Sequence, residues 1–150
     1  IKMTIQNLIN HDIKQAMLAK NVEKLAALRS AKSAFLLEAS KDGRSEISDE
    51  IALKIISKLV KQRKDSAQIY NQQNRADLEK DELDQLKFLE TYLPKQLSDD
   101  ELSEIVSTII RELGATTMKD MGKVMSIATN KTQGRCDGAK LAMVVRKSLQ

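Results

Sequence analysis

The feature that most constrains the fold of this chain is its scarcity of helix breakers. Its 150 residues include five glycines and a single proline, Pro94. Alanine, leucine, lysine, glutamate and glutamine, all good helix formers, are frequent instead. Apolar residues recur every three or four positions through most of the sequence, which is the spacing of one helix face. The sequence therefore predicts an all-α protein.

Four helices are predicted before Pro94. Thr4 is placed to cap the first and Asn21 the second, the third begins near Asp49, and the fourth lies between the polar break at residues 71–77 and the proline. Residues 1–93 are thus expected to form an N-terminal four-helix subdomain. Helical spacing predicts the inward-facing residues as Ile5, Leu8, Ile9, Ile13, Ala16, Met17, Leu25, Leu28, Phe35, Leu36, Ala39, Ile51, Ile55, Ile56, Leu59, Val60, Ala67, Leu78, Leu83, Leu86, Leu89 and Leu93.

Three more helices are predicted after a hinge at residues 94–97. The run SDDE at residues 98–101 matches a capping box, and Gly114 suits the left-handed position that ends a helix. Thr117 and Asp137 are suited to cap the two helices that follow. Residues 98–150 are expected to be a three-helix domain, with a core of Leu102, Ile105, Val106, Ile109, Ile110, Leu113, Met118, Met121, Val124, Met125, Ala128, Leu141, Val144, Val145 and Leu149.

Composition gives only weak functional bounds. The net charge of +4 favours polyanions slightly, but 25 basic and 21 acidic residues together make mostly a mixed, solvated surface. A lone cysteine, Cys136, allows no internal disulfide, so a reducing compartment is expected: the cytoplasm, with an organelle matrix also open. No apolar run is long enough to cross a bilayer, so no membrane partner is expected. Ile1 and Lys2 precede a plausible starting Met3, and their origin is open.

One group of residues combines cations with glycines. Lys131, Arg135 and Lys140 surround Gly134 and the start of the last predicted helix, and one further cation, Lys123, stands on the helix before. Helix N-termini expose amide hydrogens, glycine lets a backbone approach a ligand, and cations add charge-assisted bonds, so a phosphodiester could bind there. The alternative is structural: Gly134 serves only a turn and the cations are ordinary surface residues.

A second basic group lies on the third predicted helix. Lys61, Arg63 and Lys64 stand close together there, and Lys61 is four residues before Asp65, the spacing of an ion pair. This surface could follow a nucleic-acid backbone. It could equally be a solvated helix face, since no aromatic residues interleave with the cations to stack on bases.

Catalytic and metal-binding motifs are missing from the sequence. The only histidine, His11, has no second histidine or cysteine at ligand spacing, which favours a surface role. Cys136 has no histidine nearby in sequence to act as a base. There is no Walker loop, dinucleotide fingerprint or nucleophile elbow. No catalytic residue, metal or cofactor is assigned.

Several longer stretches resemble the GatB/YqeY family, over nearly the whole chain. They are KLVKQRKDSAQIY, NRADL, YLPKQLSDDEL and MGKVMSIATNKTQGRCDG, at residues 58–70, 74–78, 92–102 and 121–138. The match is to the small free-standing YqeY-like members. Residues 98–149 are also similar to the tail domain of the B subunit of the tRNA-dependent Asp/Glu amidotransferase. The shared positions are Gly122, Val124, Met125, Lys131, Gly134 and Asp137, while Cys136 replaces the usual alanine.

The resemblance implies a binding role, because that tail domain is associated with holding tRNA while other parts carry out catalysis. The first hypothesis is therefore a non-catalytic accessory module for tRNA or another structured RNA. It would bind phosphates through Lys123, Lys131, Gly134, Arg135 and Lys140, with Lys61, Arg63 and Lys64 as a second basic surface. The alternatives are a protein-interaction adaptor for an amidotransferase or an aminoacyl-tRNA synthetase, and a component of glutamine-dependent carbon-nitrogen ligase activity. The last lacks an evident nucleophile or ATP site.

Overall fold

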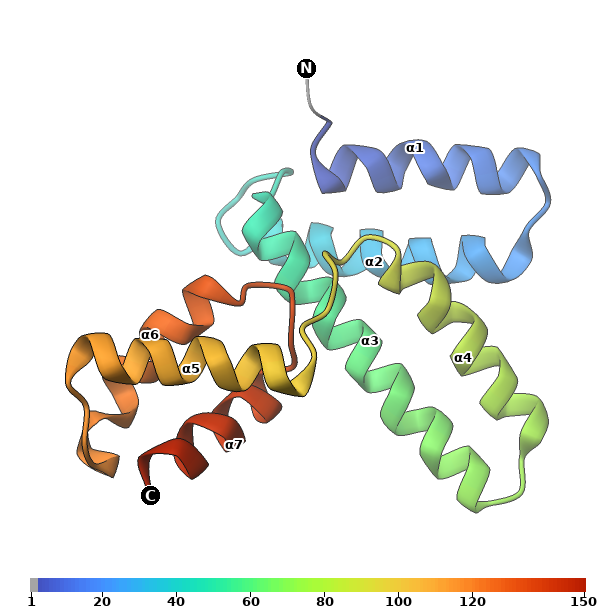
Figure 1. Ribbon diagram of the computed structural model, residues 1–150. Helices are drawn as coiled ribbons and strands as arrows, with labels where there is room; N and C mark the ends of the chain where they lie inside the picture. Colours follow the sequence, from blue (N-terminus) through green and yellow to red (C-terminus); the bar gives the residue numbers. More distant parts are fainter. Residues whose placement is uncertain (1–2) are drawn as a thin grey trace. The chain divides into compact units, whose positions relative to one another are not determined.

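The computed structural model describes residues 3–150, and over these residues it contains seven α-helices and no strand (Figure 1). The predicted all-α class is confirmed. The question of Ile1 and Lys2 lies outside the described residues. The chain divides into two compact units, one ending at Leu93 and the other beginning at Pro94. The elements are α1 (Ile5–Leu18), α2 (Val22–Ser40), α3 (Asp49–Gln72), α4 (Ala76–Glu90), α5 (Asp99–Leu113), the short 3-10 helix η1 (Met118–Asp120), α6 (Met121–Lys131) and α7 (Gly138–Leu149).

The helix starts of the first unit follow from local capping. Thr4 accepts a hydrogen bond from the Asn7 N–H, and Asn21 accepts one from the Lys24 N–H. Both predicted caps are confirmed. Helix α3 begins at Asp49 after Ser48, which caps the Ile51 N–H.

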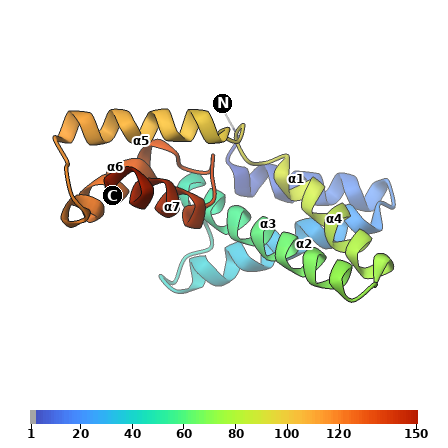
Figure 2. The ribbon, with the colours of Figure 1, turned by 60° about the horizontal axis from the view of Figure 1, so that its bottom comes forward.

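The first unit packs as two antiparallel helix pairs, α1 with α2 and α3 with α4 (Figure 1). Figure 2 shows α3 and α4 side by side from a second direction. Its core contains Ile9, Leu28, Phe35, Ile56 and Leu89, each at most 1% exposed. Small residues complete it. Ala27, Ala31 and Ala52 are equally buried, and the lack of a bulky side chain there lets neighbouring helices approach closely.

Five residues that were predicted to face inward in this unit are exposed instead. The prediction was wrong for Leu8, Met17, Leu36, Ile51 and Leu83, whose exposed fractions run from 37% to 52%. The periodic apolar stripes are wider than the area that the neighbouring helices cover, so residues at the stripe edges remain in contact with solvent.

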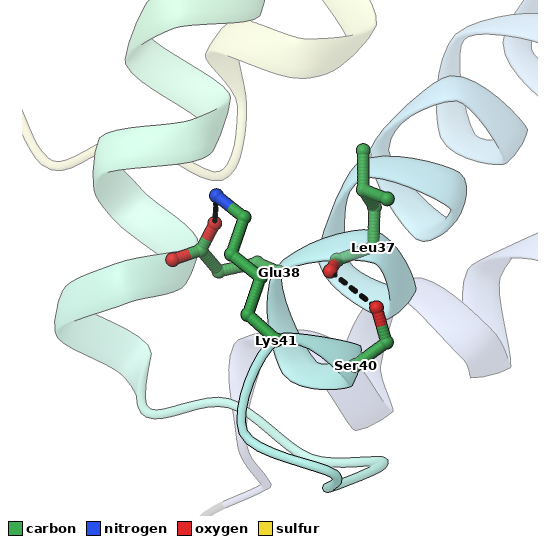
Figure 3. Close-up of polar contacts among 4 residues, drawn as sticks. All are labelled: Leu37, Glu38, Ser40 and Lys41. Carbon is green, nitrogen blue, oxygen red and sulfur yellow. Dashed lines mark hydrogen bonds and ion pairs between the residues drawn. The ribbon is translucent and has the colours of Figure 1, made fainter.

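The end of α2 is held by short-range polar contacts, drawn in Figure 3. The Ser40 hydroxyl donates to the Leu37 carbonyl at 2.7 Å, and Lys41 pairs with Glu38 at 3.0 Å. The chain then turns through Gly43, whose φ is +66°. A side chain of α1 fixes the loop that follows: the buried Gln6 amide donates to the Ser45 carbonyl and accepts from the Ile47 N–H, each at 3.0 Å.

The second unit is the three-helix group of α5, α6 and α7, with η1 leading into α6. The capping box at Ser98 and Glu101 is confirmed, as are the left-handed Gly114 at φ +66° and the Asp137 cap. The core of this unit is made of Leu97, Leu102, Val106, Ile109, Val124, Ala128, Leu141, Val145 and Leu149.

Two details of the second unit differ from the prediction. Thr117 caps η1 rather than α6 itself, because one 3-10 turn precedes the α-helix. A 3-10 helix has about three residues per turn instead of the 3.6 of an α-helix, so the side on which Met118 lies differs from the side predicted by α-helical spacing. Met118, predicted to be buried, is therefore 42% exposed, and Leu113 at the end of α5 is equally exposed.

Over residues 3–150, none of the helices combines the length and apolar character needed to span a bilayer. Within the same residues, no three histidine, cysteine, aspartate or glutamate side chains gather in a way that could hold a metal ion.

Candidate nucleic-acid interface

The loop between α6 and α7 is held in place by backbone hydrogen bonds. Gly134 takes a φ of +72°, as a turn requires, and the Arg135 N–H donates to the Thr132 carbonyl at 2.8 Å. The segment before α5 attaches to the same loop. The Leu97 N–H donates to the Arg135 carbonyl at 2.8 Å, and the Gln96 amide donates to the Gly134 carbonyl at 2.8 Å. The end of the predicted hinge thus belongs to the packed second unit, in which Leu97 is a core residue.

The N-terminus of α7 already carries one of the protein's own carboxylates. Asp137 Oδ1 accepts the Ala139 N–H at 2.9 Å. Lys140 pairs with Asp99 at the start of α5, and this contact raises the pKa of the Lys140 ammonium. A phosphate at this corner would have to compete with both carboxylates, so the N-terminus of α7 is the weakest part of the predicted site.

Two of the predicted cations, Lys131 and Arg135, line one open groove of about 310 Å³ beside α5. The Lys131 ammonium lies 4.0 Å from the Glu112 carboxylate, and both side chains are at least half exposed. Such a pair contributes roughly 0–1 kcal/mol, so Lys131 remains available to an incoming anion. Arg135 forms no ion pair within 4 Å with any acid of residues 3–150.

The fourth predicted cation is separated from these two. Lys123 lies in the first turn of α6, eight residues before Lys131, a distance of about 12 Å along the helix axis. Its positive charge acts on Asp120, in the 3-10 turn before α6. The pKa of Asp120 is lowered first by the Thr116 and Thr117 N–H groups and then by Lys123. The structure therefore brings Lys131 and Arg135 together and places Lys123 at the other end of the same helix.

The second predicted basic surface divides into exposed and structural residues. The predicted Lys61–Asp65 pair is confirmed at 3.3 Å, and Lys64 pairs with Glu90 of α4 at 3.6 Å. Arg63 is half-buried and donates to Ser30 of α2 and to Gln85 of α4. Burial lowers the pKa of its guanidinium, with a smaller opposing effect from Glu82. The Arg63 side chain thus joins three helices and offers little surface to a phosphate.

The sequence predictions missed one feature, the uneven distribution of charge between α5 and the rest of the second unit, which counting the charged residues reveals. Residues 121–150, which form α6, α7 and their loop, contain six basic residues and one acid. Helix α5 has the reverse balance, with five acids and one base. Arg146 and Lys147, in the last turn of α7, are exposed members of the basic set. We call residues 121–150 the basic hairpin.

The fold and this charge distribution define a small helical protein of two units, the second of which combines an acidic helix, α5, with the basic hairpin. A family model described as Yqey-like protein matches residues 6–149, and the chain belongs to the YqeY-like family.

Two relatives are both named "Altered inheritance of mitochondria protein 41, mitochondrial". The one from Vanderwaltozyma polyspora is 34% identical over 121 residues, which cover 75% of this chain and 64% of the relative. The one from Clavispora lusitaniae is 33% identical over 106 residues, covering 69% of this chain and 61% of the relative. The aligned part thus spans less than two thirds of either relative.

Proposed function

We propose that this protein is a non-catalytic RNA-binding accessory module, with tRNA as the first candidate ligand. The observation that carries the proposal is the charge separation within the second unit, where the basic hairpin opposes the acidic α5. A segment rich in exposed cations attracts a phosphate backbone. The resemblance of residues 98–149 to the amidotransferase tail domain supports the same ligand.

The cations proposed to contact phosphate follow from the pairing pattern. Lys123, Arg135, Arg146 and Lys147 have no ion pair within 4 Å to any acid of residues 3–150, and the Lys131 pair is weak. Lys140 would contribute less to phosphate binding than the sequence predicted, because its charge is balanced by Asp99. The contacts would recognise RNA shape and backbone, because the hairpin has no aromatic side chain to stack on bases.

A titration with tRNA over a series of salt concentrations tests this proposal. The double variant Lys123→Gln/Arg135→Gln should bind more weakly and should reduce the slope of log affinity against log salt by about two. The control, Arg111→Gln/Lys119→Gln, removes the same charge from the same unit but lies outside the basic hairpin. It should bind nearly as the natural protein does. Equal losses in both variants, or binding that does not respond to salt, would contradict the proposal.

A second candidate function is an adaptor that docks on an amidotransferase or a synthetase. The observation that favours it is the exposed apolar junction between α1 and α2, where Leu18 is 78% and Val22 75% exposed. Neighbouring exposed apolar side chains that form one contiguous patch are typical of protein–protein contact sites. Capture of a synthetase or an amidotransferase that survives nuclease and high salt, and is lost in Leu18→Ser/Val22→Ser, would favour this function over direct RNA binding.

Both functions suit the cytoplasm and also an organelle matrix. The names of the two relatives assign those proteins to mitochondria. We propose the cytoplasm or a mitochondrial matrix as the compartment of this chain.

A further inference from the structure

The groove beside α5 is lined by acids on one helix, by cations from the elements across it and by apolar residues. Glu101 and Glu104 stand on the α5 wall, and Lys131 and Arg135 stand on the opposite wall, at the end of α6 and in the following loop. Leu97, which is buried, and Ile105, which is half-buried, line the same groove. All of these residues belong to the second unit.

The opposite charges line the same groove without closing into ion pairs across it. Within residues 3–150, neither glutamate forms an ion pair within 4 Å with Lys131 or Arg135, and the acid that pairs with Lys131 is Glu112, outside the groove. A gap of about 310 Å³ separates the two walls instead. This volume is at the lower end of the range of small-molecule sites.

The two acids differ in their availability. The Glu101 carboxylate accepts the Ser98 N–H at 3.1 Å as part of the capping box, and this bond is the main reason that its pKa is lowered, with Lys95 and then Arg135 as minor causes. The Glu104 carboxylate has no hydrogen bond or ion pair to any residue of the described part of the chain. Glu104 is therefore the acid of this groove that has no partner among residues 3–150.

We infer that this groove binds a small zwitterion, of which an apolar amino acid is the simplest example. The anionic group would lie against Arg135 and Lys131, the cationic group against Glu104, and the apolar part on Leu97 and Ile105. A ligand with both charges inside the groove satisfies both walls, whereas a ligand with only an anionic group leaves Glu104 without a partner. The inference goes beyond RNA binding, because it requires the acidic wall that RNA does not use.

Three matched probes test the inference with the full isotope-labelled chain. L-leucine carries both charges, 4-methylpentanoate lacks the ammonium group, and 3-methylbutylamine lacks the carboxylate. We expect leucine to shift the amide signals of Arg135 and Glu104 in NMR spectra, with a Kd in the millimolar range. Each analogue should bind at least tenfold more weakly. 6-Aminohexanoate, with its charges further apart, tests whether a wider zwitterion spans the groove better.

A pair of variants separates this site from the RNA proposal. Glu104→Gln should weaken leucine binding at least tenfold while leaving tRNA affinity equal or higher, since it removes only a negative charge. The control Asp100→Asn makes the same change in charge on α5 outside the groove and should bind leucine as the natural protein does. The inference is overturned if neither leucine nor 6-aminohexanoate moves these signals, if 4-methylpentanoate binds as tightly as leucine, or if the two variants behave alike. None of these results depends on RNA binding.

Discussion

The Arg63 guanidinium donates two hydrogen bonds to one atom, the side-chain oxygen of Gln85, at 3.2 and 3.1 Å. A further bond from the same group reaches the Ser30 hydroxyl at 2.9 Å. Helix α3 is thereby joined to α4 and to α2 through a single planar side chain. The guanidinium is half-buried without an acid in direct contact, so its stabilisation comes from oriented neutral acceptors.

This geometry predicts that Arg63→Lys destabilises the first unit although the charge is retained. A lysine cannot reproduce the planar fork, so we expect a loss of about 1–2 kcal/mol in the free energy of unfolding. The exposed neighbour provides the control, since Lys64→Arg should change stability by less than about 0.5 kcal/mol. Urea denaturation followed by circular dichroism measures both. An unchanged midpoint for Arg63→Lys would show that the network adds nothing to stability.

Gln6→Ala should loosen the loop between α2 and α3. The substitution removes both hydrogen bonds that hold Ser45 and Ile47 and should cost about 1–3 kcal/mol. Hydrogen exchange at residues 43–48 should accelerate, while Gln15→Ala, at an exposed position of the same helix, should leave it unchanged. Equal exchange rates in the two variants would mean that the loop holds its conformation without Gln6.

Substitution by alanine at two glycines of the second unit should change the stability of the protein in opposite directions. Gly114 has a φ of +66°, so Gly114→Ala strains the backbone by about 1–2 kcal/mol although no atom lies within 4 Å of the new methyl group. Gly122 is helical with equally open space, and Gly122→Ala should stabilise by up to about 1 kcal/mol. Thermal unfolding of each variant measures the difference. A stabilising Gly114→Ala would contradict the assigned helix end.

Tyr92 should confer stability that is lost in alkaline solution. Burial raises the pKa of its phenol, and a 2.5 Å hydrogen bond to Asp12 raises it further. Because the folded-state pKa lies above the unfolded value of about 10, the stabilisation is complete below pH ~10 and is lost as the pH rises through the folded value. Tyr92→Phe should cost about 1–2 kcal/mol at neutral pH and abolish this alkaline loss. Denaturation of the natural protein and of Tyr92→Phe over a series of pH values measures this loss. A parallel decline of the unfolding free energy in both proteins would show that other groups cause the alkaline loss.

The secondary structure could largely be predicted from the sequence, because its signals are local. Thr4, Asn21, Ser98 and Asp137 each cap a helix within three residues of their own position, and Gly114 ends one through its own backbone angle. Burial was predicted less well. The spacing identified Ile9 and Phe35 correctly but also included Leu36 and Leu83, which the neighbouring helices leave exposed.

The candidate site was predictable only as a set of residue types. The sequence by itself determined that the second unit contains a basic hairpin beside an acidic helix, because charge follows directly from composition. Only the tertiary structure decided which charges are free. Lys140 is paired with Asp99, 41 residues away, whereas Arg135 opens onto a groove. Electrostatic pairing depends on distance in space, and the packing of α5 against α6 and α7 sets those distances.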